Sequence, residues 1–80
     1  MNIYELVKED MTTLGHMGSN PRTEYRKYFS TSKTAQDYAQ ADYGDTKITW
    51  KGNGICVSSG DLRYVMYDIF TKEVDEEYNG

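Results

Sequence analysis

The chain has 80 residues and a formal net charge of −4. A chain of this length buries only about two-thirds of its unfolded surface, so residues 1–80 are expected to form a single domain. Eight tyrosines, two phenylalanines and one tryptophan supply apolar area and argue against disorder, while no apolar run approaches the roughly 20 residues of a membrane span.

Residues 2–14 fit two alternative elements. As a helix they begin with Asn2 as N-cap and Glu5 three residues later, and one stripe then contains Ile3, Val7, Met11 and Leu14. As a strand, Ile3, Glu5 and Val7 lie opposite Tyr4 and Leu6. Capping and periodicity favour the helix, and these residues alone leave both alternatives open. The acidic residues near the N-terminus differ from a signal peptide, which predicts a cytoplasmic protein.

Residues 15–21 contain two glycines and the only proline, which predicts a loop. Backbone N–H groups and hydroxyls in such a loop can bind an anion, so His16, Ser19 and Asn20 are candidate ligand-binding residues.

Residues 23–29 alternate in the manner of an exposed strand, with Tyr25 and Phe29 on one face and Arg26 and Tyr28 on the other. The wider segment 22–33 is locally basic and aromatic. Guanidinium groups beside aromatic rings bind phosphate and stack on bases, so we name Arg22, Arg26 and Tyr28 as candidate binding residues. The alternative is that Tyr25 and Phe29 belong to the core and the charges are an ordinary solvated face.

Residues 32–43 give the clearest helix. Ser32 is the expected N-cap, no helix breaker follows it, and Gly44 stands where a left-handed residue would end the helix. Its inward stripe is mostly alanine and tyrosine, which lets a helix lie close to a sheet.

Residues 47–51 alternate as a half-buried strand, with Ile48 and Trp50 inward. Residues 52–54 predict a tight hairpin turn, residues 55–57 a returning strand and residues 58–61 a second turn. Cys56 is expected to be a small strand residue, because a single cysteine cannot form an internal disulfide and no neighbouring group activates it.

Residues 62–74 again fit either a helix or a strand, but most of the residues from Tyr64 to Thr71 are typical of strands. We therefore predict an α+β fold in which a small antiparallel sheet of four to five strands has one helix, at about 32–43, packed on one face.

The acidity is concentrated at the C-terminal end. Residues 61–80 contain six acidic and two basic residues, whereas residues 1–60 contain seven of each. Asp75, Glu76 and Glu77 form a candidate surface for a basic partner. Eight tyrosines are too many for the interior of one small domain, so Tyr28, Tyr64, Tyr67 and Tyr78 are candidates for a partner or homodimer surface.

Catalytic signatures are missing. The sequence contains no phosphate-binding loop, no histidine pair at metal spacing and no nucleophile in a recognisable motif. We expect a protein that is not an enzyme and that uses no cofactor or metal.

The order of several segments resembles small accessory proteins of tailed bacteriophages, of the host-takeover or anti-defence type. The similar segments are Asn-Ile-Tyr-Glu-Leu-Val at residues 2–7, Tyr-Arg-Lys-Tyr-Phe-Ser-Thr at 25–31, Ile-Thr-Trp at 48–50 and Ser-Gly-Asp-Leu-Arg-Tyr-Val-Met-Tyr-Asp-Ile at 59–69. The resemblance favours a strand for residues 2–8 and implies a protein made in an infected bacterium.

Three functions are consistent with the sequence. The first is a binding protein that inhibits a bacterial host component, in particular a defence protein, by occluding it. The second is a sponge that sequesters a nucleotide-like immune signal, and the third is a structural or assembly component of a virion. No direct nucleic-acid binding and no membrane contact are expected.

Overall fold

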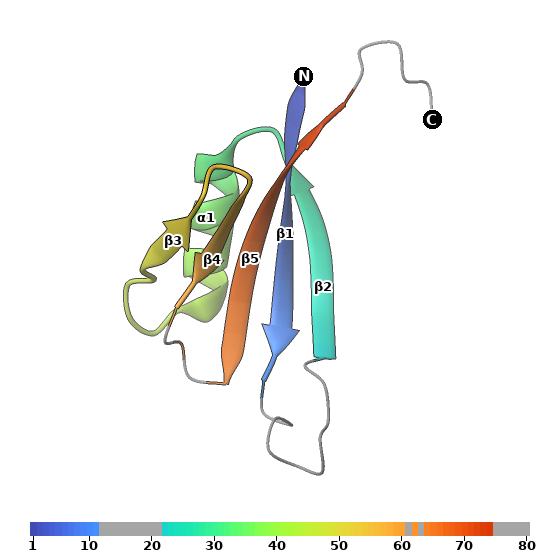
Figure 1. The fold of residues 1–80 in the computed structure, drawn as a ribbon. Coiled ribbons are helices and arrows are strands. Elements are labelled where there is room, and N and C mark those ends of the chain that lie inside the picture. The colour runs from blue at the N-terminus through green and yellow to red at the C-terminus, as the bar shows by residue number, and fades with distance from the viewer. Residues whose placement is uncertain (12–21, 61, 63, 75–80) are drawn as a thin grey trace.

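The computed structural model describes residues 1–11, 22–60, 62 and 64–74. Five strands and one helix follow the order β1 (Asn2–Asp10), β2 (Arg22–Phe29), α1 (Ser32–Tyr43), β3 (Trp50–Gly52), β4 (Cys56–Ser59) and β5 (Val65–Glu73). The predicted α+β fold with one antiparallel sheet and a single helix is confirmed (Figure 1).

The strands form one antiparallel sheet in the order β2-β1-β5-β4-β3. β1 and β5 pair along their whole length, from Asn2 opposite Glu73 to Asp10 opposite Val65. Residues 2–10 and 65–73, which lie in the two segments that each fitted two elements, therefore form strands. Both segments are strands and not helices, because pairing with neighbouring strands supplies backbone hydrogen bonds that outweigh the local helical periodicity.

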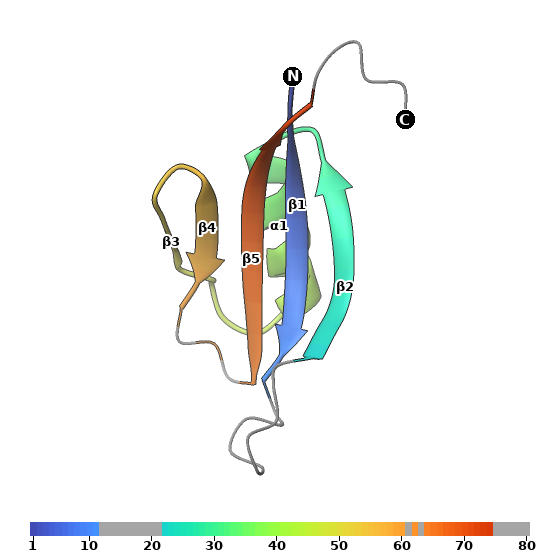
Figure 2. The same cartoon turned by 45° about the vertical axis from the view of Figure 1, so that its right-hand side comes forward.

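Helix α1 packs on one face of this sheet, and no described helix or strand covers the other face, which we call the uncovered face (Figure 2). Its bounds are those predicted, and Gly44 ends it with a left-handed φ of 69° and an N–H that donates to the Gln40 carbonyl. The predicted N-cap is one residue off. Thr31 has the extended backbone of an N-cap, and its hydroxyl accepts from the Thr34 N–H at 3.1 Å.

The core lies between α1 and the sheet. Alanines face the sheet from the helix, which permits close approach, and larger residues fill the space from the strands. Its buried members are Leu6, Ala35, Ala39, Ile48, Tyr67 and Ile69. As predicted, Ile48 is buried and Trp50 packs against this core.

The hairpin differs from its prediction in detail. β3 begins only at Trp50, because the Ile48 N–H donates to the Gln40 side chain instead of to another strand. Ser58 and Ser59 belong to β4 and not to a turn, and the Ser59 hydroxyl accepts from the Tyr67 N–H at 2.8 Å. Gly52 is needed in β3, since a Cβ there would lie 2.5 Å from the Cys56 carbonyl oxygen.

Candidate functional site

The two faces of the sheet are distinguished by the alternation of β1. Leu6 packs in the core and Lys8 reaches Asp42 on α1, so the even-numbered residues of β1 face the helix. Glu5, Val7 and Glu9 therefore lie on the uncovered face, the side of the sheet that faces the viewer in Figure 2. Glu5 and Val7 are nevertheless buried, and each lies between directly paired residues of β2 and β5 on this face.

Glu5 is the centre of a charged and aromatic cluster on this face. Its side chain is 6% exposed, and its Oε2 accepts a hydrogen bond of 2.8 Å from the Tyr28 hydroxyl. Lys72 Nζ lies 3.4 Å and Arg26 Nη1 3.7 Å from Oε1 of the same carboxylate. We call Glu5, Arg26, Tyr28 and Lys72 the Glu5 cluster.

The electrostatics of the cluster favour an ionised Glu5. Burial alone would raise its pKa, but the Tyr28 hydrogen bond and the charges of Lys72 and Arg26 outweigh burial, so the pKa of Glu5 lies below its ordinary value. The same hydrogen bond raises the pKa of the Tyr28 phenol. At neutral pH the cluster therefore holds one anion, two cations and a neutral phenol.

A second carboxyl group on the uncovered face behaves in the opposite way. Burial and the neighbouring Asp68 raise the pKa of Glu9. Asp68 is buried, at 8% exposure, whereas Glu9 is half-buried. The carboxylates of Glu5 and Asp68 on this face are thus withdrawn from solvent, while the side chains of Arg26 and Lys72 beside Glu5 are about half exposed.

The covered face holds a comparable group of side chains. The Asp42 carboxylate on α1 accepts a hydrogen bond of 2.7 Å from the Tyr67 hydroxyl and forms an ion pair with Lys8 at 2.9 Å. Burial alone would raise the pKa of Asp42, but these contacts lower it below its ordinary value. Lys8 Nζ also lies 5.8 Å from the centre of the Tyr67 ring. Burial and Asp42 raise the pKa of the phenols of Tyr67 and Tyr25, and the buried Tyr25 hydroxyl has no hydrogen-bond partner among the described residues.

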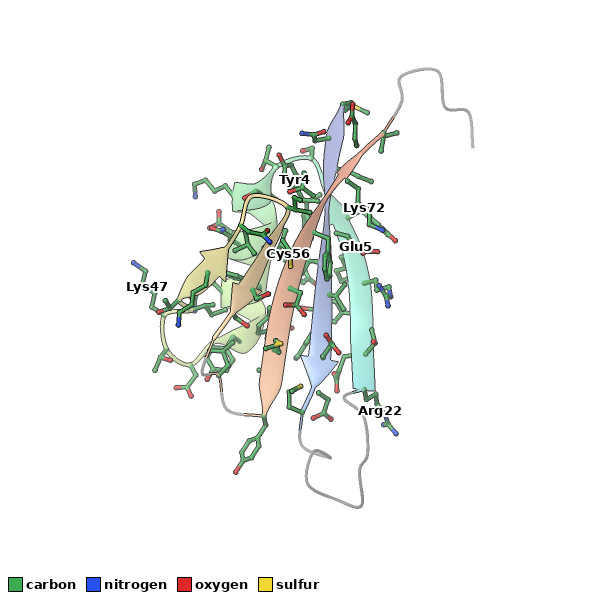
Figure 3. The ribbon with its side chains drawn as sticks, in the orientation of Figure 1. Tyr4, Glu5, Arg22, Lys47, Cys56 and Lys72 are labelled. Atoms are coloured by element: carbon green, nitrogen blue, oxygen red, sulfur yellow. The ribbon has the colours of Figure 1, made fainter. Side chains whose placement is uncertain are left out.

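The structure brings two of the predicted binding residues together and separates a third. Arg26 and Tyr28 meet at Glu5, whereas Arg22 lies at the far end of β2 from Glu5 and Lys72 (Figure 3). The register shifts between Lys8 and Glu9, which leaves Glu24 without a partner in β1. The alternation that would have placed Arg22 on the same face is interrupted by this bulge, and Arg22 pairs with Asp10 instead.

Tyr67 is the clearest correction among the predicted contact residues. It is 0% exposed and belongs to the core, so it cannot form part of a partner surface. Tyr64 is 57% exposed with a φ of 68°, but it precedes β5 at the end of the sheet opposite Lys72. The remaining candidates lie outside the described residues, and they are His16, Ser19, Asn20, Asp75, Glu76, Glu77 and Tyr78.

Sequence reasoning missed Glu5 and Lys72 as site residues. An available signal was the carboxylate at the middle of the otherwise apolar run of residues 3–7, since a charge there needs partners if both faces are crowded. The identity of those partners depends on the pairing of β1 with β2 and β5, which are distant in sequence.

Metal binding and membrane spanning find no support in the described part of the chain. It contains no group of three or more His, Cys, Asp or Glu side chains arranged to hold a metal ion. Cys56 is a half-buried free thiol on the uncovered face, with its Sγ 3.6 Å from the Ser58 hydroxyl. In the same residues no helix has the length and apolar character needed to cross a bilayer.

Comparisons with protein-family models, with curated proteins and with solved structures find no match to this chain.

Proposed function

We propose that the chain is a non-catalytic binding protein that contacts a partner protein through the uncovered face of its sheet, with the Glu5 cluster at the centre of the contact. The observation that supports this proposal is that one buried carboxylate holds three exposed side chains together. Tyr28 is 59% exposed, and the side chains of Arg26 and Lys72 are 56% and 51% exposed.

Fixing these side chains in advance favours binding. Arginine and tyrosine are enriched among the residues that dominate protein interfaces. An interface residue that is ordered only on binding loses about 0.5 to 1.5 kcal/mol of rotamer freedom, and the contacts with Glu5 remove part of that cost beforehand. Because the accessible charges around Glu5 are cationic, the matching partner surface is one that presents carboxylates.

The partner that we propose is a bacterial host component, in particular a protein of an antiviral defence system, which the chain inhibits by occlusion. This part of the proposal rests on the resemblance of the chain's segments to phage accessory proteins. An acidic partner surface differs from the basic partner that the C-terminal acidic residues suggest.

A nucleotide-like ligand at Arg26 and Tyr28 has less support from the geometry. Both side chains already contact Glu5, whose ionised carboxylate would oppose a phosphate at the same place. A protein carboxylate meets the same repulsion, but it carries less charge and is accompanied by contacts over a whole interface.

The test is affinity capture from a bacterial host lysate, followed by titration of the captured protein after its purification. Lys72→Gln and Arg26→Gln should each weaken binding at least tenfold, which corresponds to about 1.4 kcal/mol. Lys33→Gln is the matched control, because it makes the same charge change at an exposed lysine on α1. Circular dichroism verifies that each variant is folded.

Failure to capture a specific protein, or equal affinities for Lys72→Gln, Arg26→Gln and the Lys33→Gln control, would contradict the proposal.

A further inference from the structure

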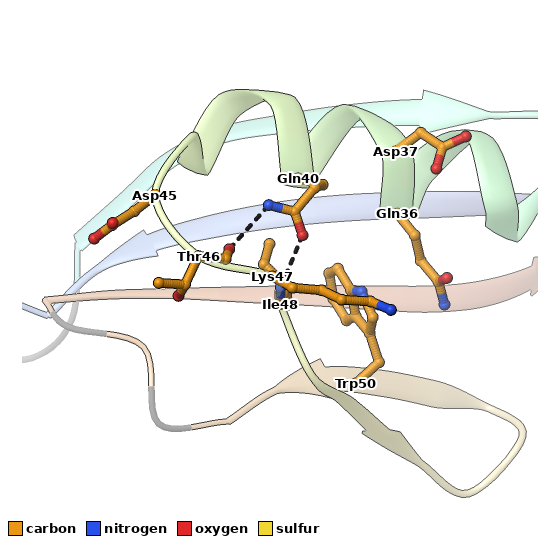
Figure 4. A pocket seen from close by; sticks show the side chains of 8 residues that line it. All are labelled: Gln36, Asp37, Gln40, Asp45, Thr46, Lys47, Ile48 and Trp50. Atoms are coloured by element: carbon orange, nitrogen blue, oxygen red, sulfur yellow. Dashed lines mark hydrogen bonds between the residues drawn. The ribbon is translucent and has the colours of Figure 1, made fainter.

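A second candidate site lies on the other side of the molecule, in a cleft between α1 and the residues that lead into β3. The cleft has a volume of about 480 Å³, within the range of roughly 300 to 1,000 Å³ that is common for ligand sites. Gln36, Asp37 and Gln40 line it from the helix, Asp45, Thr46, Lys47 and Ile48 from the connection, and Trp50 from β3 (Figure 4).

Gln40 fixes the position of the connection that forms one side of the cleft. Its Nε2 donates to the Thr46 carbonyl at 3.0 Å, and its Oε1 accepts from the Ile48 N–H at 2.7 Å (Figure 4). Both ends of one amide are used to attach the connection to the helix, so the cleft exists before any ligand arrives. Ile48, at 3% exposure, supplies an apolar floor.

Several groups around this cleft are free for a ligand. The side chains of Gln36, Asp45 and Lys47 make no hydrogen bond or ion pair within the described residues, and Trp50 is half-buried. Asp37 pairs only with Lys33 among those residues, at 3.0 Å, and both side chains are well exposed. The lining therefore has one aromatic surface, one unused amide, one ammonium and two carboxylates, of which Asp45 is unpaired and Asp37 is paired with exposed Lys33.

We propose that the α1–β3 cleft binds an arginine side chain of a polypeptide. A guanidinium is planar and weakly hydrated, stacks on indole rings and pairs with carboxylates, and so uses two kinds of group that the cleft offers. A nucleotide would use the indole as well, but its phosphate would face Asp37 and Asp45. The charge of Lys47 should weaken binding of the cationic arginine side chain and strengthen binding of the anionic nucleotide. Removing this charge should therefore change the two affinities in opposite directions.

The chain's single tryptophan lines the cleft, so its fluorescence reports on occupancy directly. N-acetyl-arginine amide is the probe, and N-acetyl-citrulline amide is its neutral isostere. We expect the arginine probe to quench the tryptophan fluorescence or shift its emission maximum in a saturable way, with a Kd on the order of millimolar. The citrulline probe should cause no saturable change in this fluorescence. Asp45→Asn should weaken binding about threefold or more and Lys47→Gln should tighten it.

Three results would overturn the proposal. These are equal binding of citrulline and arginine, no saturable change at roughly tens of millimolar arginine probe, or tighter binding of adenosine monophosphate that Lys47→Gln weakens. The inference is independent of the Glu5 cluster, so Lys72→Gln should leave the arginine titration unchanged.

Discussion

The two faces of the sheet each hold one carboxylate that is bound by a tyrosine hydroxyl and a lysine. On the covered face Asp42 contacts Tyr67 and Lys8, which are 0% and 18% exposed. On the uncovered face Glu5 contacts Tyr28 and Lys72, which are both more than half exposed. The same chemistry thus joins the helix to the sheet in one place and presents side chains to solvent in the other.

This difference in accessibility suggests that the groups around Asp42 and the groups around Glu5 have different roles, the first in stability and the second in binding. We expect the groups that surround Asp42, which include the fully buried Tyr67, to contribute mainly to the stability of the fold. The more exposed groups that surround Glu5 are expected to contribute less to stability and to be available to a partner. Matched substitutions on the two faces test the distinction.

The largest expected difference is between Tyr67→Ala and Tyr28→Ala. Loss of the buried Tyr67 ring leaves a cavity in the core and should lower the free energy of unfolding by about 3 to 5 kcal/mol. Tyr28→Ala should lower the midpoint of urea unfolding much less, because the ring is exposed and only its hydrogen bond to Glu5 is lost. Similar midpoints for the two variants would show that the faces do not differ in this way.

The lysines form the next pair. Lys8→Gln removes a partly buried ion pair and a contact with the Tyr67 ring, and should lower the free energy of unfolding by about 1 to 2 kcal/mol. Lys72→Gln should cost less than about 1 kcal/mol, since Lys72 is half exposed and Glu5 retains Tyr28 and Arg26. Chemical denaturation at pH 7 measures the free energy of unfolding of both variants. A larger decrease for Lys72→Gln than for Lys8→Gln would contradict the view that the covered face contributes more to stability.

The carboxylates give a pH-dependent comparison. The pKa values of Glu5 and Asp42 are both depressed in the folded state, so their stabilisation is present above the ordinary values of 4.5 and 3.8 and is lost as pH falls through the folded values. Glu5→Gln and Asp42→Asn should each reduce stability at pH 7, by about 1 kcal/mol for Asp42→Asn. The difference from the wild type should shrink as the pH falls below the ordinary values. A deficit that stays constant across an acid titration of the folded protein would exclude this linkage.

The smallest effect has the opposite sign. The pKa of Glu9 is raised in the folded state, so ionised Glu9 destabilises the fold at pH values above its folded pKa, and this cost disappears as pH falls below its ordinary value of 4.5. Glu9→Gln should therefore stabilise the protein at pH 7 by about 0.5 kcal/mol. Thermal unfolding at pH 7 measures this gain, and a lower melting temperature for the variant would contradict it.

Much of the architecture could be predicted from residues close together in the sequence, whereas most of the Glu5 cluster could not. Helix α1 and the separation of Tyr25 and Phe29 from Arg26 and Tyr28 could be predicted, because capping residues and alternation act over a few positions. The contact between Glu5 and Lys72 depends on the pairing of strands that are 67 positions apart in the chain. The bulge at Glu24 and the burial of Tyr67 are likewise results of tertiary packing.

Photo-crosslinking in living bacterial cells tests the central claim most directly, because the crosslink forms with whichever protein occupies the surface. Benzoylphenylalanine is placed at position 28 on the uncovered face or at position 38 on α1, where Tyr38 is 39% exposed. We predict a discrete crosslinked protein from position 28 and none from position 38. A crosslink from position 38 alone, or the same product from both positions, would contradict a contact surface centred on the Glu5 cluster.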